Sequence, residues 1–442
     1  MGTLLCYINA HAMKYTFFFL FLWMLAVNVM GQSFAYSPYS RFGLGFLQKD
    51  GGDMESFAMG GLNVSYFSNT SLAYGNPAGI AYLGQSLDSM PFLFVGNIAG
   101  QFARIEGDGK VAYPFNISLN SFGGGFKLYK KINASIGFTP FSQVDYKIKF
   151  TDSLDSLATT NFYSGRGGLN NIWLGMGWSV NKYISVGIKA NYLFGSILNE
   201  KKIMFNAPNF LHAKITNQDF YHTPLYLPIV DVGVIGIIPL KRGWEIRMGL
   251  HYRPTQKFKE NIAFQAYRFI NSGGFDYIKD TVITNDSIKG FSTLPDEWEG
   301  GIFINNGNTF GMGFQFSYSP WEKFKSLSNM DLLTKAFTVS IGGFLASSKN
   351  TAKLRKQIKW NYGFRYQQSP FTLNQQHVNQ ISLSLGCVMP LAPIYQKLQK
   401  SWLTFGVEMG ILGSKENLRQ DYILWKFGMI FTEKWFEKKL YK

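Results

Sequence analysis

The chain of 442 residues is long enough for two or three soluble domains or for one large barrel. Charged residues make up only 16%, against roughly 25% in soluble proteins, whereas aromatic residues make up 17% and glycines number 46. The formal net charge of +16 comes from basic residues scattered over predicted turns and loops without a recognition motif, which argues against a nucleic-acid partner.

The N-terminus carries the pattern of a secretory signal peptide. A lysine after Met13 precedes an apolar core over residues 15–27, and Gly31 supplies the small residue required before the cleavage site. We therefore expect residues 1–31 to be removed and the mature chain to begin at Gln32. Because the residues before Met13 dilute this pattern, Met13 is the expected start of translation.

Residues 32–88 do not alternate as the strands of a barrel wall do. They are rich in Gly, Ser, Asn and Tyr, and Pro77 pushes Asn76 out of the α-helical region. A segment too irregular to face lipid must lie in the lumen or the periplasm, where protein or water satisfies its polar groups. We expect it to form an N-terminal plug, or hatch.

From residue 89 to residue 432, stretches of about ten residues with alternating hydrophobicity are separated by turns. In residues 310–318, aromatic residues and Met alternate with Gly, Gln and Ser, so one face of the strand is bulky and the other is small or polar. Bulky faces toward lipid and polar faces toward a lumen fit a membrane barrel better than a soluble sandwich. The expected strands begin near Met90, Asn116, Ile132, Gly165, Tyr183, Tyr221, Trp244, Asp296, Asn308, Lys335, Ile358, Gln376, Ser401 and Gln420.

The connections between these strands mostly alternate in length. Short connections are expected at 129–131, 181–182, 240–243 and 305–307, and long ones at 150–164, 199–219, 254–294 and 319–334. Barrels of this kind have short periplasmic turns and long outer loops, so an even strand number places both termini in the periplasm. The expected fold is all-β: a single transmembrane antiparallel β-barrel of about 14 strands with a plug in its lumen, followed by a basic periplasmic tail over residues 433–442.

The plug segment carries a family resemblance. Gly60 and Gly61, followed about fifteen residues later by Asn76, Pro77 and Ala78, resemble the N-terminal hatch of the FadL family. Members of that family are outer-membrane transporters of long-chain fatty acids and aromatic hydrocarbons. The resemblance implies that these five residues belong to a hatch that plugs the lumen, and that the protein lies in the outer membrane of a Gram-negative bacterium.

The resemblance also implies a route through the barrel. Residues 199–219 and 254–294 would form an outer collecting groove, and a kink in a wall strand would open a lateral exit. Pro140 is the candidate for the kink, since proline cannot donate to a sheet ladder. Residues 36–45 and the short basic tail are similar to those of a Bacteroidetes branch related to this family.

No pattern in the sequence indicates an enzyme, a cofactor or a metal. The histidines lack metal-ligand spacing, and neither a nucleophile elbow nor a nucleotide-binding glycine motif is present. By strand parity, a basic group faces the lumen: Arg247, His251, Arg253 and Arg365. A guanidinium can bind a carboxylate head group in a two-point fork. The alternative is that these side chains pair with Asp231, Glu245 and Glu408 or solvate the lumen.

Two functions remain open. The first is an outer-membrane channel for passive uptake of small, fatty-acid-like hydrophobic molecules, gated by the hatch. The alternative is a non-transporting structural or shuttle subunit of a large outer-membrane complex, such as a secretion or barrel-assembly machine, similar to PorV-type barrels. Charges in the long outer connections favour the alternative. Expected partners are outer-membrane lipids, a hydrophobic small molecule, and other outer-membrane or periplasmic proteins.

Overall fold

A computed structural model describes residues 37–48, 53–68, 70–83, 91–154, 157–207, 210–307, 309–328, 332–346, 357–391 and 401–434. The expected signal peptide, Gln32 and residues 435–442 of the basic tail lie outside these ranges. No helix in the described ranges is long and apolar enough to cross a membrane.

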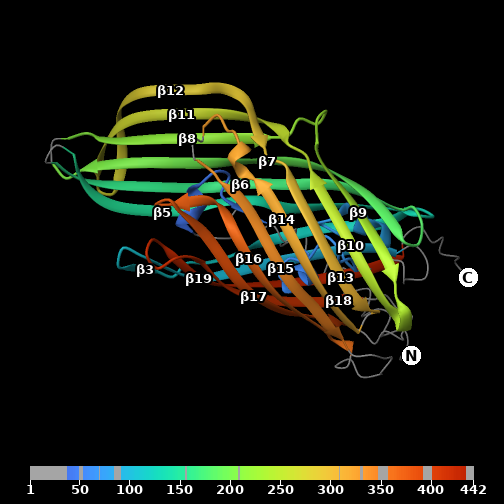
Figure 1. Cartoon of the computed structure of the whole chain (residues 1–442). Helices are drawn as coiled ribbons and strands as arrows, with labels where there is room; N and C mark the ends of the chain where they lie inside the picture. The colour runs from blue at the N-terminus through green and yellow to red at the C-terminus, as the bar shows by residue number, and fades with distance from the viewer. Residues whose placement is uncertain are drawn as a thin grey trace, which may run out of the picture. The chain divides into compact units, whose positions relative to one another are not determined.

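In the described part of the chain, fourteen antiparallel strands form a closed wall (Figure 1). In order around the wall they are β2 (Pro91–Gly107), β4 (Phe115–Tyr129), β5 (Ile132–Leu154), β6 (Leu157–Ser179), β7 (Ile184–Phe205), β9 (Ile229–Pro239), β10 (Trp244–Arg253), β13 (Glu297–Asn306), β14 (Phe310–Pro320), β15 (Lys335–Ala346), β16 (Lys359–Leu373), β17 (Gln376–Pro390), β18 (Ser401–Gly413) and β19 (Arg419–Lys434). The barrel closes where β19 pairs with β2, from Arg419 opposite Glu106 to Lys434 opposite Pro91. The predicted barrel of about 14 strands is therefore confirmed.

The wall strands alternate as their sequences predict. In β14, Met312, Phe314 and Phe316 are exposed on the outside, whereas Gly311 and Gln315 are buried toward the lumen. Most strands begin within two residues of the predicted positions. The exceptions are β6, which begins eight residues before Gly165, and β9, which begins eight residues after Tyr221.

Strands also form where long connections were predicted, and these predictions were wrong. Residues 150–164 complete β5 and begin β6, and residues 199–219 and 254–294 hold the end of β7 and three further strands. The additional strands are β8 (His212–His222), β11 (Gln256–Ser272) and β12 (Phe275–Leu294). They pair in the order β7–β8–β11–β12 and, with the outer parts of β5 to β7, form a sheet that projects beyond the wall (Figure 1).

We call this projecting sheet the outer sheet, and the end of the barrel that bears it the outer end. Its strands form because polar and apolar residues alternate in these segments too, so each segment can pair with its neighbour. Gly273 and Gly274, both with positive φ, make the tight turn between β11 and β12. A further short strand, β3 (Lys110–Ala112), folds back on the outer end of β2.

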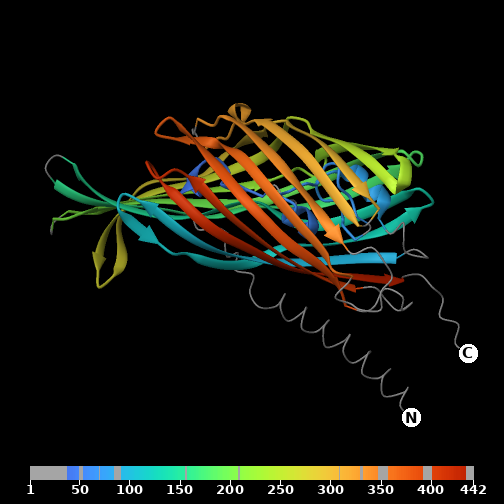
Figure 2. The same ribbon diagram turned by 60° about the horizontal axis from the view of Figure 1, so that its bottom comes forward.

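The plug occupies the lumen over its described residues, 37–48, 53–68 and 70–83 (Figure 2). Its short elements are η1 (Pro38–Arg41), β1 (Phe46–Leu47), α2 (Met54–Ala58) and η2 (Pro77–Tyr82). The Asp53 side chain caps α2, and the Asn76 side chain caps η2 by accepting a hydrogen bond from the Ala78 amide. Pro77 occupies the first turn of η2, where its missing N–H costs nothing.

The plug spans the lumen from one end to the other. Near the outer end, the Tyr39 hydroxyl donates to the carbonyl of Leu418, between β18 and β19. Near the opposite end, the Asn133 side chain, at the start of β5, donates to the carbonyls of Ile80, Ala81 and Leu83 at 3.0–3.1 Å. The first described residues therefore lie toward the outer end, opposite the end at which β19 finishes.

Glycines on the inner wall allow the plug backbone to lie directly against the strands. A methyl group on any of five wall glycines would lie 2.1–2.4 Å from a plug backbone atom; they are Gly177, Gly187, Gly249, Gly342 and Gly363. No residue with a side chain can replace them without moving the plug. These contacts give part of the high glycine content a structural role.

Polar side chains of the wall also hydrogen-bond to the plug backbone. Gln315 accepts hydrogen bonds from the backbone amides of Asn63 at 2.8 Å and Val64 at 3.1 Å. Ser340 donates to the carbonyl of Gly60, and Ser384 donates to that of Ala58. The irregular plug backbone is thus satisfied by protein at membrane depth, as it must be.

We expect Gly187→Ala to loosen the plug, because the new methyl group would lie 2.2 Å from the carbonyl carbon of Pro77. Overpacking of this kind costs about 1–3 kcal/mol. Hydrogen–deuterium exchange should rise in residues 76–83. Gly236→Ala is the matched control, since nothing lies within 4 Å of its added methyl group. Equal exchange in the two variants would show that close contact at Gly187 does not hold the plug in place.

Candidate functional site

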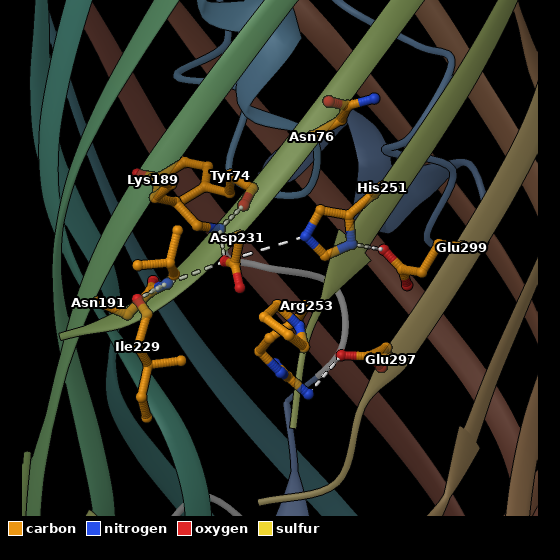
Figure 3. A network of polar contacts seen from close by, with 12 residues as sticks. Tyr74, Asn76, Lys189, Asn191, Ile229, Asp231, His251, Arg253, Glu297 and Glu299 are labelled. Carbon is orange, nitrogen blue, oxygen red and sulfur yellow. Dashed lines mark hydrogen bonds and ion pairs between the residues drawn. The ribbon is translucent and has the colours of Figure 1, made fainter. Parts of the chain in front are cut away.

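A network of charged side chains lines the lumen beside the plug (Figure 3). The Nζ atom of Lys189, on β7, lies 3.0 Å from the Oδ2 atom of Asp231 on β9 and donates to the carbonyl of Tyr74 in the plug at 2.7 Å. The Asn191 side chain donates to the same Asp231 oxygen at 2.9 Å. The network therefore joins two wall strands to the plug.

Two further pairs continue the network across β10 and β13. The Nδ1 atom of His251 lies 3.0 Å from Oε2 of Glu299, and the guanidinium of Arg253 lies 2.7 Å from Oε2 of Glu297. Cross-strand register produces these pairs, because His251 is directly opposite Glu299 and Arg253 is opposite Glu297. Opposite charges at facing positions stabilise antiparallel pairing.

The other two predicted basic residues also have carboxylate partners. Arg247 lies 2.5 Å from Glu245 and donates to the carbonyl of Phe67 in the plug at 3.0 Å. Arg365 contacts both carboxylate oxygens of Glu408, at 2.6 and 2.7 Å. An anionic head group would have to displace a carboxylate partner to bind any of the four basic residues.

Sequence reasoning missed several residues of this site. The acidic partners Glu297 and Glu299 follow directly on the predicted strand start at Asp296, so strand parity could have placed them in the lumen. Asn133 and Gln315 carry no such signal, because their role depends on where the plug backbone lies.

Two cavities in the described part of the chain lie beside the plug, and both are small. One has a volume of about 110 Å³ and touches Lys189, Asp231 and Arg253 as well as Pro140. The other, of about 130 Å³, lies against Arg365 and several glutamines. Small-molecule sites usually measure about 300–1,000 Å³ and are mostly apolar. Neither cavity reaches that size, and polar and apolar side chains line both of them.

The outer mouth of the barrel is closed by a hydrophobic cluster. The ring of Tyr39 stacks on Phe371 at 5.8 Å, and Phe42 stacks on the same ring at 5.4 Å. Leu44 and Trp321 are buried in the same cluster. The start of the plug thus covers the mouth with side chains as well as backbone.

A buried ion pair holds the helical part of the plug. The Lys359 ammonium, on β16, lies 2.6 Å from Oε2 of Glu55 in α2. Tyr66 and Thr70 also donate hydrogen bonds to the Glu55 carboxylate. Gly60 and Gly61 follow α2 with φ of 74° and 90°, which lets the chain turn sharply.

A seam in the wall lies between β4 and β5. These strands pair only from Tyr129 and Ile132 up to Phe122 and Phe138. Pro140 lies two residues after Phe138, the last residue of β5 that pairs with β4. The next residue, Phe141, has no partner in β6, because the register between β5 and β6 shifts there. Above the shift, β1 of the plug covers the exposed edge of β5 instead of β4.

Lys359→Met should loosen α2, because it leaves the Glu55 carboxylate buried without its cation. Breaking such a pair costs about 3–5 kcal/mol. We expect faster hydrogen exchange in residues 54–68, and substantial recovery in the double variant Lys359→Met, Glu55→Gln, which removes both charges. If the single and double variants exchange equally fast, the ion pair does not hold the plug.

Solved structures with a similar fold are FadL-like barrels. They include a FadL homologue from Pseudomonas aeruginosa (12% identity, TM-score 0.53, covering 86% of this chain and 96% of that chain). The toluene transporter TbuX from Ralstonia pickettii (11%, 0.55, 87% and 99%) and the monoaromatic hydrocarbon channel CymD (13%, 0.52, 89% and 99%) are also similar. At 11–13% identity the likeness shows the fold alone, a β-barrel of this kind.

Sequence comparison gives a more specific assignment. No curated protein matches the chain at a significant level. A family model described as BamG matches residues 13–442, which include the whole barrel and plug. This chain, a fourteen-stranded barrel with a plug in its lumen, therefore belongs to the BamG family.

Proposed function

We propose that this protein is a subunit of a larger outer-membrane protein complex, that its barrel is closed by the plug, and that its surfaces bind partner proteins. The observation behind this proposal is the filled lumen. The plug backbone lies directly against the wall glycines, and Lys359 forms an ion pair with Glu55 in its α-helix, α2. The two cavities beside the plug, of about 110 and 130 Å³, are too small for a fatty acid.

The outer sheet offers a surface for a partner. Residues 272–285, which end β11 and begin β12, are exposed on both faces of the hairpin. Their exposed apolar side chains include Phe275, Tyr277, Ile278, Val282 and Ile283. Contiguous exposed apolar residues of this kind mark contact sites for other proteins. The proposed partner is a protein at the outer face of the membrane.

Native mass spectrometry of the chain, extracted gently from its own outer membrane, tests this proposal. We expect a mass shared with other proteins in fixed stoichiometry. Replacing Phe275, Ile278 and Ile283 by serine should release the partner while the barrel stays folded. The control replaces Val111 and Tyr113, exposed near β3, by serine. A lone chain carrying a small apolar adduct would overturn the proposal.

A second candidate function is passive uptake of a small hydrophobic molecule through the seam between β4 and β5. The specific observation is that, above Phe122 and Phe138, β1 of the plug covers the edge of β5. The cavity beside the seam touches Leu47, Pro140 and Phe141. A cavity of about 150 Å³ binds benzene in another protein, so the expected ligand is a small aromatic hydrocarbon. In this case the start of the hatch is the gate.

A disulfide across the seam tests this second candidate. Leu47 is directly opposite Ser142, so cysteines at both positions, in a Cys387→Ser background, should crosslink. We expect the crosslinked chain to lose toluene uptake into proteoliposomes and to regain it on reduction. Cysteines at Thr338 and Gln367, opposite each other in β15 and β16, are the control. If toluene uptake by the crosslinked seam variant is the same before and after reduction, this route is excluded.

A further inference from the structure

Lysines and aromatic rings share one face of the outer sheet where this sheet meets the wall. Directly opposed residues of antiparallel strands point to the same side, so the pairing register identifies this face. Phe194 of β7 is opposite His222 of β8. Lys259 of β11 lies between His222 and Phe291 of β12, whose ring is exposed. These residues form one row across four strands, which we call the Lys259 row.

The two neighbouring rows bring three more lysines to the same face. On one side, Lys257 is opposite Thr293, and Thr293 forms a bridge with Lys325 in the connection after β14. On the other side, Lys289 is opposite Asn261. One of the four lysines is half-buried and the other three are exposed. We call this group the basic rim: Lys257, Lys259, Lys289 and Lys325.

The charge of the basic rim is not neutralised within the described part of the chain. None of its four ammonium groups forms an ion pair with a described carboxylate. Further from the wall on the same face, in contrast, Lys202 pairs with Asp276 at 2.7 Å. The acidic residues of β8 and β11, Asp219 and Glu260, are buried on the opposite face. The basic rim therefore presents positive charge to an external anion.

The basic rim lies where the apolar band of the wall ends. On the outer surface of β6, Leu174 and Ile172 are exposed. The next residue on that surface, Asn170, is opposite Phe194 and so belongs to the Lys259 row. Two residues along a strand span about 7 Å. The lysines therefore lie close to the level at which the hydrocarbon of the membrane meets the lipid headgroups.

The connection from β8 to β9 places apolar side chains beside these lysines. Leu225, Tyr226 and Leu227 are 85%, 77% and 52% exposed. The ammonium of Lys259 lies over the Tyr226 ring, 5.9 Å from its centroid. Basic groups beside exposed aromatic and aliphatic groups suit a surface that enters the headgroup layer. The combination favours a lipid over a soluble acidic partner, which would match the lysines but not the leucines.

We propose that the basic rim binds the phosphate groups of a phosphorylated lipid in the membrane leaflet at the outer end of the barrel. Lysine ammonium groups bind phosphate oxygens as point charges. Lys257 and Lys289 are four residues apart in register, about 13 Å along the strands, so the rim can contact two phosphates at once. The expected lipid therefore carries more than one phosphate. This inference does not depend on the proposed function, whose partner surface is the hairpin of residues 272–285.

Native mass spectrometry of the full mature chain in mild detergent tests the proposal. The probe is bisphosphorylated lipid A, and the comparison lipid is a glucosyl diacylglycerol, which has acyl chains but no phosphate. We expect the wild-type chain to retain lipid A and to release the comparison lipid. Replacing Lys257, Lys259 and Lys289 by glutamine should weaken lipid A binding about tenfold or more, because each lysine near an anionic membrane surface contributes about fivefold in affinity.

The matched control replaces Lys149, Lys202 and Lys214 by glutamine. These lysines lie on the same face in one row with Phe162, and the change in net charge is the same. Lys202 is eight residues beyond Phe194, about 26 Å along β7, so this row lies away from the membrane. The control variant should bind lipid A as the wild type does. Equal weakening in both variants would overturn the proposal, because it would reflect net charge alone.

Three other results would also overturn the proposal. Equal retention of the two lipids would show that acyl chains alone bind. Displacement of lipid A by inorganic phosphate at the same concentration would show that the rim binds free phosphate. A rim variant that keeps lipid A but loses a protein from complexes extracted from the outer membrane would identify a protein interface. If the triple variant does not fold, the single change Lys289→Gln, at an exposed position, should weaken lipid A binding about fivefold.

Discussion

The structure depends on backbone-to-backbone contact between the plug and the glycines of the wall. A barrel of about 8 strands is filled by its own side chains, whereas wider barrels enclose a cavity or a channel. Fourteen strands leave a lumen that something else must fill. Gly187 and Gly363 let the plug lie against the strands without an intervening layer of side chains. The interior is consequently packed like a protein core.

Once the backbones touch, every polar group at their interface needs a partner. The side chains of Asn133 and Gln315 form hydrogen bonds with plug peptide groups that are not paired in a β-sheet. The same requirement explains the charges: cross-strand pairs such as Arg253 with Glu297 neutralise each other inside a confined space. The lumen therefore combines close packing with a polar lining, which distinguishes it from the apolar pocket that a large hydrophobic ligand needs.

The outer end of the barrel behaves as a single packed unit. The start of the plug, the outer sheet and the loop after β14 all contribute side chains to one hydrophobic cluster. The buried carboxylates of Asp219 and Glu260 lie where two of these parts meet. Binding of a partner to the exposed hairpin would act on this unit, whereas the seam lies where β4 stops pairing with β5, beyond Phe122 and Phe138.

Alternating hydrophobicity was enough to predict the barrel, its fourteen wall strands and nearly all of their starting points. Alternation is a local property, because each residue of a strand faces either lipid or the lumen. The strands within residues 199–219 and 254–294 depend on partners distant in the chain, because β8 pairs with both β7 and β11. The ion pairs in the lumen and the glycines that contact the plug backbone likewise follow from the three-dimensional arrangement. Register and packing join residues far apart in the chain, and no local periodicity encodes them.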